Sequence, residues 1–194
     1  MSDLLHVARD ARGVVTLTLN DPARFNALGH EMLAALQQAL DEVARDEGAR
    51  VVVLAAAGKA FCAGHNLKDM AQHPDLAWYQ DLFARCSRVM LAIHKLPVPV
   101  IARVHGMATA AGCQLVAQCD LAVASEAASF ATSGIHYGLF CATPSVSLVR
   151  NVPAKRAMEM LLTGDFIDAR TALAEGLVNR VAPPEALDAE VQAL

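Results

Sequence analysis

The stretch "GMATAAGCQLVAQCD", residues 106–120, combines small residues with one uncharged polar side chain at the start of an apolar helix. Five of its first seven positions are glycine or alanine, where a core usually has bulky side chains: Gly106, Ala108, Ala110, Ala111 and Gly112. It follows an apolar strand pattern at residues 98–105, and Gln114 falls in the predicted first turn of the helix. A loop of small residues between a buried strand and a helix leaves backbone N–H groups free at the positive end of the helix dipole.

A second loop has the same design. The segment "GKAFCAGHNLKDM", residues 58–70, follows a continuously apolar run at residues 49–57 and leads into a predicted helix. Ala63 and Gly64 allow the backbone to approach a ligand closely. Two such loops on neighbouring strands can direct two N–H donors at one oxygen, which is the arrangement of an oxyanion hole. The alternative interpretation is that the small residues only permit close packing of helices on the sheet.

The rest of the pattern predicts an α/β fold. Residues 13–20 alternate in polarity and form a predicted hairpin with residues 4–10, whereas residues 30–48 repeat apolar side chains at helical spacing. A long amphipathic helix is predicted over residues 75–96, and short helices follow from residue 145. Units of two strands and a helix therefore recur, which favours an α/β domain with a mainly parallel core.

The chain of 194 residues is interpreted as a single domain, because no linker interrupts it. The predicted core covers residues 1–182, and residues 183–194 begin a C-terminal helical region. The amphipathic segment "PEALDAEVQAL", residues 184–194, has no following sequence to cover its apolar face. We therefore expect the C-terminal helical region to be missing or truncated.

Composition and charge argue against several classes of protein. The net charge of −4, with acids and bases interspersed, disfavours nucleic acid as a partner. No apolar run is long enough for a membrane span, and the N-terminal segment lacks the pattern of a signal peptide, so we expect a soluble, cytoplasmic protein. The five cysteines form no CxxC pair and are predicted to be reduced and buried, with no metal site.

Several motifs resemble those of the crotonase superfamily, also called the enoyl-CoA hydratase/isomerase family. They occur in order: "FNAL" at residues 25–28, "FCAGHNLKDM" at 61–70, "PVPVIARVHGMATAAGCQLVAQCDLAVAS" at 97–125, "SFATSGIHYGLF" at 129–140 and "ALAEGLVNRV" at 172–181. The resemblance implies a crotonase-type spiral of β-β-α units that binds an acyl-CoA or enoyl-CoA thioester. CoA enters as part of the substrate, and no covalently bound cofactor is implied. A homotrimer or a dimer of trimers, supported by the C-terminal helical region, is also implied.

The resemblance assigns the oxyanion hole to two backbone groups. The first donor would be the N–H of His65, and the second would be the N–H of Ala111. The family usually has glycine at the second position, but a main-chain donor tolerates alanine there. The same resemblance makes Gln114 the residue at a position where hydratases of the family carry a glutamate.

The resemblance also assigns residues that would bind CoA. The segment from Ala63 through Gly64 to Leu67 would line the pocket for adenine. Arg24 and Lys68 would meet the phosphates through charge-assisted hydrogen bonds. For Lys68, a solvated position on the helix surface is the alternative.

Two positions depart from the pattern of the hydratases, which place a water molecule between two glutamates. Gln114 and Gly134 stand at these positions. Gln114 can orient a water molecule but cannot take a proton near neutral pH, and Gly134 has no side chain. His136 is a candidate replacement base, because the ordinary pKa of histidine, about 6.5, suits that role. The side chain of His65 is a second candidate, and a hydrogen-bonded structural histidine is the alternative for both.

Other polar residues receive structural roles. Asp69 is interpreted as a helix-face charge, Cys141 as a core residue and Asp120 as a hydrogen-bonding residue at the end of a helix. Ser133 and His136 do not define a catalytic triad. Two functions therefore remain open. The first is an acyl-CoA enzyme that hydrolyses, decarboxylates or weakly hydrates its substrate, and the second is a protein that binds acyl-CoA without turnover.

Overall fold

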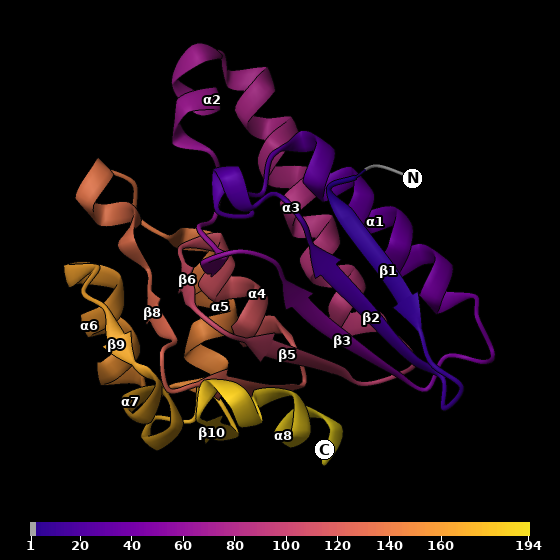
Figure 1. Ribbon diagram of the computed structural model, residues 1–194. Coiled ribbons are helices and arrows are strands. Elements are labelled where there is room, and N and C mark those ends of the chain that lie inside the picture. The colour runs from indigo at the N-terminus through magenta and orange to yellow at the C-terminus, as the bar shows by residue number, and fades with distance from the viewer. Residues whose placement is uncertain (1–2) are drawn as a thin grey trace.

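Two sheets of unequal size organise the chain in the computed structural model, which describes residues 3–194 (Figure 1). The larger sheet has the order β1-β2-β3-β5-β7-β10, and every pair except β1–β2 is parallel. Its strands are β1 Leu5–Arg9, β2 Val14–Leu19, β3 Val51–Ala56, β5 Val100–Val104, β7 Leu121–Ser125 and β10 Arg180–Ala182. The predicted hairpin and the mainly parallel α/β core are confirmed.

The smaller sheet was not predicted from the sequence. It has the order β4-β6-β8-β9, with β4 and β6 parallel and β8 and β9 antiparallel. Its strands are β4 Ala60–Cys62, β6 Met107–Thr109, β8 Ser129–Ala131 and β9 Ile167–Asp168. Strands of two or three residues are too short for an alternating pattern to reveal them. Strands β4 and β6 lie within the segments 58–70 and 106–120, so this small sheet places the two segments side by side.

Helices surround the two sheets, and the long α1 and α3 lie beside each other over the larger one (Figure 1). The α-helices are α1 His30–Ala44, α2 Leu67–Gln72, α3 Leu76–Lys95, α4 Ala111–Gln118, α5 Ala142–Asn151, α6 Ala154–Thr163, α7 Ala169–Ala174 and α8 Leu187–Gln192. Short 3-10 turns form η1 Pro22–Arg24, η2 Ser133–Tyr137 and η3 Pro184–Ala186. Helices α1 and α3 bury one apolar face each in the main core, as their predicted periodicity requires.

The last helix covers the second face of the larger sheet. Leu187 and Val191 of α8 are buried, only 1% and 4% exposed, against one residue from each of three central strands: Val53, Ile101 and Val123. An ion pair between Arg103 of β5 and Asp188 adds a polar contact. The expectation that this segment has nothing to cover its apolar face is therefore wrong, because the sheet itself provides the cover.

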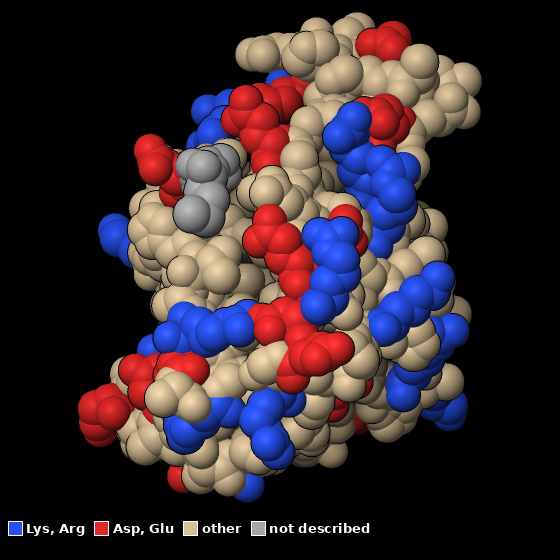
Figure 2. Space-filling view, turned by 90° about the vertical axis from the view of Figure 1, so that its right-hand side faces the viewer, with Lys and Arg blue, Asp and Glu red and all other residues tan. Residues whose placement is uncertain are grey.

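The described residues contain no helix that is both long and apolar enough to cross a membrane. All five cysteines are free and buried, and burial raises the pKa of Cys62, Cys86 and Cys113 to about 12. The thiols are therefore poor nucleophiles. On the face shown in Figure 2, basic and acidic side chains are interspersed.

Candidate functional site

The smaller sheet brings the two predicted loops together. Strands β4 and β6 run parallel, with Cys62 opposite Ala108, so their carboxyl ends lie at the same edge. After β4 the chain passes through Gly64 to His65 and enters α2, whose first turn is capped by the side chain of Asn66. After β6 the chain turns at Ala110 and enters α4. Both N–H groups proposed as donors therefore follow the carboxyl ends of two adjacent strands at the same edge of the sheet.

Close contacts at two glycines show how tightly the loops pack. A Cβ atom on Gly64 would lie 3.0 Å from the backbone nitrogen of Ala111, so the first loop passes directly beside the second donor. A Cβ atom on Gly112 would lie 2.1 Å from the carbonyl oxygen of Cys62, which leaves no room for any side chain. The small residues are thus needed for this approach, as both of the sequence-based interpretations require.

The two N–H groups carry no hydrogen bond to any other residue in the described part of the chain. Ala110, just before the second donor, has φ 51° and ψ −121°, a conformation that strongly favours glycine. Its N–H donates to the carbonyl of Ala131 at 2.9 Å, and its carbonyl accepts the N–H of Gln114 at 3.1 Å. The strained backbone is therefore held from both sides, as often occurs at functional sites.

Asn26 is a buried polar residue that the sequence analysis did not single out. It is 0% exposed, and its side chain joins the turn after η1 to the loop after β3 by hydrogen bonds to Ala57 and Ala60. Phe25 and Asn26 both adopt left-handed backbone conformations, with φ 52° and 55°. The sequence signals were the place of Asn26 in the "FNAL" motif and the residue type, since asparagine tolerates this conformation better than most residues.

The His65 ring turns toward α3. It makes an edge contact with the ring of Phe83, with centroids 5.1 Å apart, and its Nε2 is buried without a partner in the described residues. Burial lowers the pKa of His65 to about 4, with a smaller contribution from the charge of His30. At neutral pH the ring is uncharged and a weak base, which disfavours the side chain as a general base.

Positions 114 and 134, where the resemblance places the glutamates of hydratases, differ in their surroundings. Gln114 is 6% exposed, and its Oε1 is buried without a partner in residues 3–194, so a ligand or water could satisfy it. At Gly134 a Cβ atom would lie 2.4 Å from the carbonyl oxygen of Leu139 and 2.8 Å from Sγ of Cys141. The turn of residues 134–139 therefore closes over the position, and no side chain fits there.

His136 is exposed, and its Nε2 lies 2.8 Å from the carbonyl of Thr163 at the end of α6. A carbonyl only accepts, so Nε2 carries the proton and only Nδ1 could act as a base. Ser133 instead pairs with the hydroxyl of Thr109 at 2.7 Å. The described hydrogen bonds include none between Ser133 and His136.

Two further structural predictions are confirmed. Cys141 is 7% exposed and belongs to the main core. The carboxylate of Asp120 accepts the N–H of Val100 at 2.8 Å and so fixes the start of β5.

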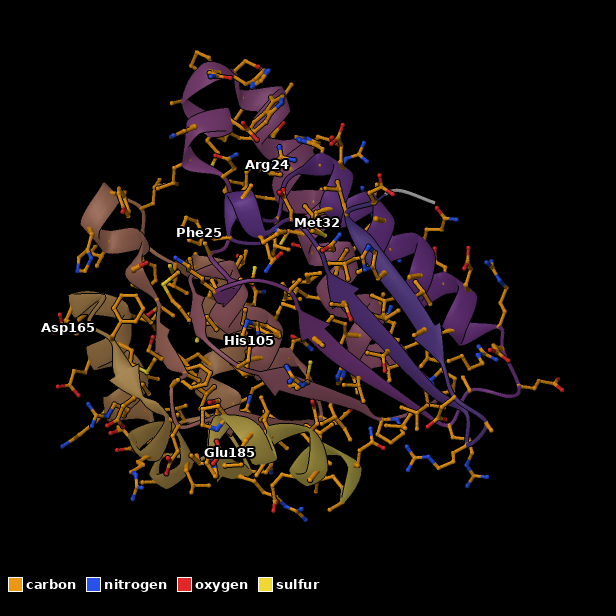
Figure 3. The ribbon with its side chains drawn as sticks, viewed as in Figure 1. Arg24, Phe25, Met32, His105, Asp165 and Glu185 are labelled. Carbon is orange, nitrogen blue, oxygen red and sulfur yellow. The ribbon has the colours of Figure 1, made fainter. Side chains whose placement is uncertain are left out.

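The residues predicted to bind CoA lie around α2 and η1. Arg24 and Phe25 lie on the turn below α2 in the view of Figure 3. The guanidinium of Arg24 is already paired with Asp21 at 2.7 Å, whereas Lys68 is exposed and has no carboxylate partner in the described part of the chain. Ala63 is half-buried and Leu67 is exposed.

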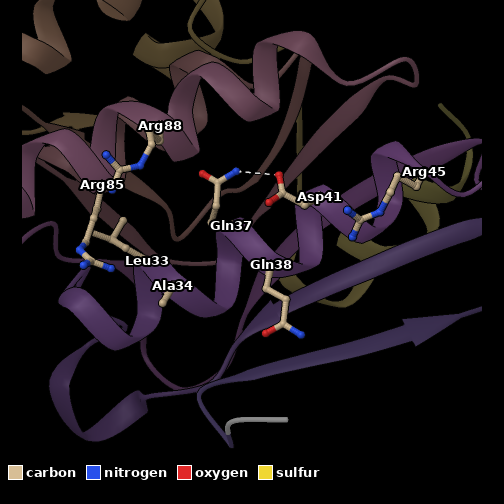
Figure 4. A pocket seen from close by; sticks show the side chains of 8 residues that line it. All are labelled: Leu33, Ala34, Gln37, Gln38, Asp41, Arg45, Arg85 and Arg88. Atoms are coloured by element: carbon tan, nitrogen blue, oxygen red, sulfur yellow. Dashed lines mark hydrogen bonds between the residues drawn. The ribbon is translucent and has the colours of Figure 1, made fainter.

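One surface groove adjoins this region, and another lies apart from it. A groove of about 260 Å³ is lined by Arg24, Asn66 and Asp69 together with Trp78, whose ring stacks on His73. A second groove, of about 330 Å³, lies between α1 and α3, where Gln37 donates to Asp41 (Figure 4). None of the predicted site residues lines this second groove.

The chain belongs to the enoyl-CoA hydratase/isomerase family, because the family's sequence profile matches residues 9–194. An enoyl-CoA hydratase structure from Mycobacterium smegmatis is 63% identical, with a TM-score of 0.97, and the match covers 99% of this chain and 75% of that one. The structure of human enoyl coenzyme A hydratase domain-containing protein 3 is 43% identical, with a TM-score of 0.94 over 98% of this chain and 75% of that one. The predicted crotonase fold is therefore confirmed.

A curated relative, mitochondrial enoyl-CoA hydratase domain-containing protein 3 of Mus musculus, is 46% identical over 94% of this chain. The chain spans 61% of the length of that relative, so a third or more of the relative has no counterpart here. "Mitochondrial" belongs to the name of the mouse protein. The cytoplasmic location expected for this chain stays a prediction.

Proposed function

We propose that this chain binds an acyl-CoA or enoyl-CoA thioester and polarises its carbonyl between the N–H groups of His65 and Ala111. The observation that carries the proposal is the approach of the two loops, with the position of a Gly64 Cβ only 3.0 Å from the nitrogen of Ala111. Two unpaired donors at one sheet edge, beside strained backbone, form a preorganised site for an oxygen that gains negative charge.

The mechanism is the electrostatic half of crotonase chemistry. As charge develops on the thioester oxygen, in an enolate or a tetrahedral intermediate, the two N–H groups stabilise it. Each such donor contributes about 3 kcal/mol to transition-state stabilisation. The dipole of α4 adds to this effect, because Ala111 is the first residue of that helix.

Positions 114 and 134 of this chain provide no acid or base for proton transfer. Gln114 can hold a water molecule or a substrate oxygen through its amide but has no proton to exchange near neutral pH. The turn at Gly134 has no space for a carboxylate. We therefore expect hydration of enoyl-CoA to be inefficient, although the family includes hydratases.

Two alternatives follow from the same site. A protein that binds acyl-CoA without turnover is favoured by the absence of a carboxylate at positions 114 and 134. Thioester hydrolysis or decarboxylation with His136 as the base is less favoured, because that ring is exposed and bonded to Thr163. Arg24, Lys68 and the segment 63–67 would contact CoA in every case, and a homotrimer or a dimer of trimers is the proposed assembly.

A proline substitution tests the second donor. Proline fits the helical φ of the first position of a helix, where Ala111 lies, and it removes the N–H. The melting temperatures of both proline variants are measured first, because the strained Ala110 directly precedes this position. The matched control is Ala154→Pro, since Ala154 is the exposed first residue of α6. Both variants and the wild type are incubated with a panel of acyl-CoA and enoyl-CoA thioesters, and binding and products are followed by calorimetry and mass spectrometry.

We expect Ala111→Pro to lower any turnover by about 100-fold or more, with the control unchanged. Binding without turnover across the panel would favour the binding-protein alternative. Turnover that survives in Ala111→Pro would overturn the role of this donor. If no thioester binds to the wild type, the proposed function is wrong although the fold stands.

A further inference from the structure

The turn of residues 25–28 is hydrogen-bonded to the first loop directly before the N–H of His65. We infer that Asn26 is a positioning residue for the oxyanion hole: it fixes the turn of residues 25–28, and this turn sets the direction of the His65 N–H. The inference rests on the proposed function, because it concerns a donor of the same site.

Asn26 uses all of its polar atoms within the protein. Its side-chain oxygen accepts the N–H of Asp21 at 2.8 Å, and its side-chain NH₂ donates to the carbonyls of Ala57 and Ala60 at 2.8 and 2.9 Å. Its own carbonyl lies 3.2 Å from Sγ of Cys62. Because the residue is 0% exposed, water does not compete for these bonds. A single side chain thus connects η1 to both sides of the turn between β3 and β4.

The residues beside Asn26 continue the same connection toward the donor. The N–H of Ala63 donates to the carbonyl of Phe25 at 3.0 Å, and the N–H of Leu28 donates to the carbonyl of Gly64 at 2.8 Å. The Gly64 carbonyl and the His65 N–H belong to one planar, trans peptide unit, so they point in opposite directions. The hydrogen bond from Leu28 therefore fixes the His65 N–H to point away from the turn.

The conformation of the turn explains why asparagine is suited to this position. Asn26 has φ 55°, in the left-handed region that asparagine tolerates better than most residues. Aspartate has nearly the same shape, but it would place a carboxylate oxygen against the carbonyls of Ala57 and Ala60. A glycine would keep the backbone conformation and lose all three side-chain hydrogen bonds.

The test measures polarisation of the carbonyl and affinity for CoA separately. The full chain binds an acyl-CoA that is ¹³C-labelled at the thioester carbonyl, and the carbon chemical shift reports the strength of the two donors. We expect a downfield shift in the wild type. In Asn26→Asp and Asn26→Gly we expect at least about half of that shift to be lost, since one of two donors is misdirected. Affinity for CoA is measured alongside, and the carbonyl shifts are compared at saturation with the ligand, because Arg24 and the segment 63–67, proposed to contact CoA, adjoin the same turn.

The matched control is Asn151→Asp on α5. The side chain of Asn151 also donates to two carbonyls, those of Ala117 and Ser147, both at 2.9 Å, but it lies on another part of the fold. This variant should keep the full carbonyl shift even if its melting temperature falls. A wild-type shift that persists in both Asn26 variants overturns the positioning role. A wild type with no shift refutes the proposed function instead.

Hydrogen exchange in the wild type decides the question if both Asn26 variants fail to fold. Amides of Ala63 and Leu28 that are equally protected with and without acyl-CoA support a loop that is set before the ligand binds. Amides that become protected only when acyl-CoA binds overturn the inference, because the ligand and not the turn would then orient His65.

Discussion

The two loops that hold the proposed donors and the turn of residues 132–141 differ in how they are built. In the loops, backbone atoms touch backbone atoms: a Cβ atom on Gly112 would overlap the Cys62 carbonyl, and one on Gly64 would lie only 3.0 Å from the nitrogen of Ala111. In the turn, residues 136–140 are exposed, and Tyr137 is 66% exposed. The donors are main-chain groups fixed by the packing of the loops, whereas proton transfer depends on the side chain present at a position, which a substitution changes without moving the backbone. A sequence can therefore lose its acid and base and still keep the site that polarises a carbonyl.

The first prediction has the largest expected effect and tests the close backbone packing of the two loops. Gly112→Ala places a methyl group 2.1 Å from the Cys62 carbonyl, so we expect a loss of about 3 kcal/mol or more in the free energy of unfolding and loss of thioester binding. Urea denaturation measures the first effect, and calorimetry measures the second.

The control for this variant is Gly138→Ala in the exposed turn. Gly138 has φ 74°, but nothing lies within 4 Å of its Cβ position, so only backbone strain of about 1 kcal/mol is expected. Equal losses in the two variants would contradict the difference in packing between the two regions.

The second prediction concerns the ring of His65, the residue of the first donor, whose Nε2 atom is buried. Burial lowers the pKa of His65 to about 4, so the unfolded chain binds a proton more readily than the folded protein. The free energy of unfolding should therefore fall as the pH decreases from 6.5 to 4, by roughly 3 kcal/mol at most. Urea denaturation at a series of pH values measures this dependence.

Replacing the ring should remove most of that pH dependence. His65→Gln should show a flatter profile between pH 6.5 and 4 than the wild type. His105→Gln should remove a smaller part: burial also lowers the pKa of His105, but the hydrogen bond with the Gly58 carbonyl opposes that shift. An unchanged profile in His65→Gln would mean that the ring is not held neutral in the interior.

The third prediction has the smallest expected effect and tests the proton-transfer side. Gln114→Glu puts a carboxyl group at a site that is 6% exposed, so we expect a loss of about 2 kcal/mol at neutral pH that shrinks as the pH falls and the acid becomes neutral. Hydration of an enoyl-CoA should rise by less than about tenfold, because position 134 still lacks the second carboxylate. A spectrophotometric hydration assay checks the rate, and a rise of about 100-fold or more would show that a single carboxylate is sufficient.

Much of the fold could be predicted from periodicity. The apolar spacing of residues 32–43 and the continuous apolar run of β3 gave the correct element types, because both signals are local. The short strands β4 and β6 were missed because three residues carry no pattern. The burial of α8 was missed because its partner strands lie far away in the sequence.

The candidate site was predictable only in part. The loops were recognisable by their small residues, and the departures at Gln114 and Gly134 by their residue types. Asn26 could not be found in this way, because its partners Ala57 and Ala60 lie more than thirty residues away in the chain. The hydrogen bond between His136 and the Thr163 carbonyl could likewise not be predicted, since only folding brings η2 against the end of α6.

The most direct test of the central claim is a ¹³C NMR spectrum of an enoyl-CoA bound to the full chain, with labels at the thioester carbonyl and at the carbon that a hydratase would hydrate. We expect a downfield shift of the carbonyl signal while the second carbon remains an alkene for many hours. A carbonyl signal that does not move would refute the two donors, and an alkene that converts to an alcohol at an enzymatic rate would refute the loss of proton transfer.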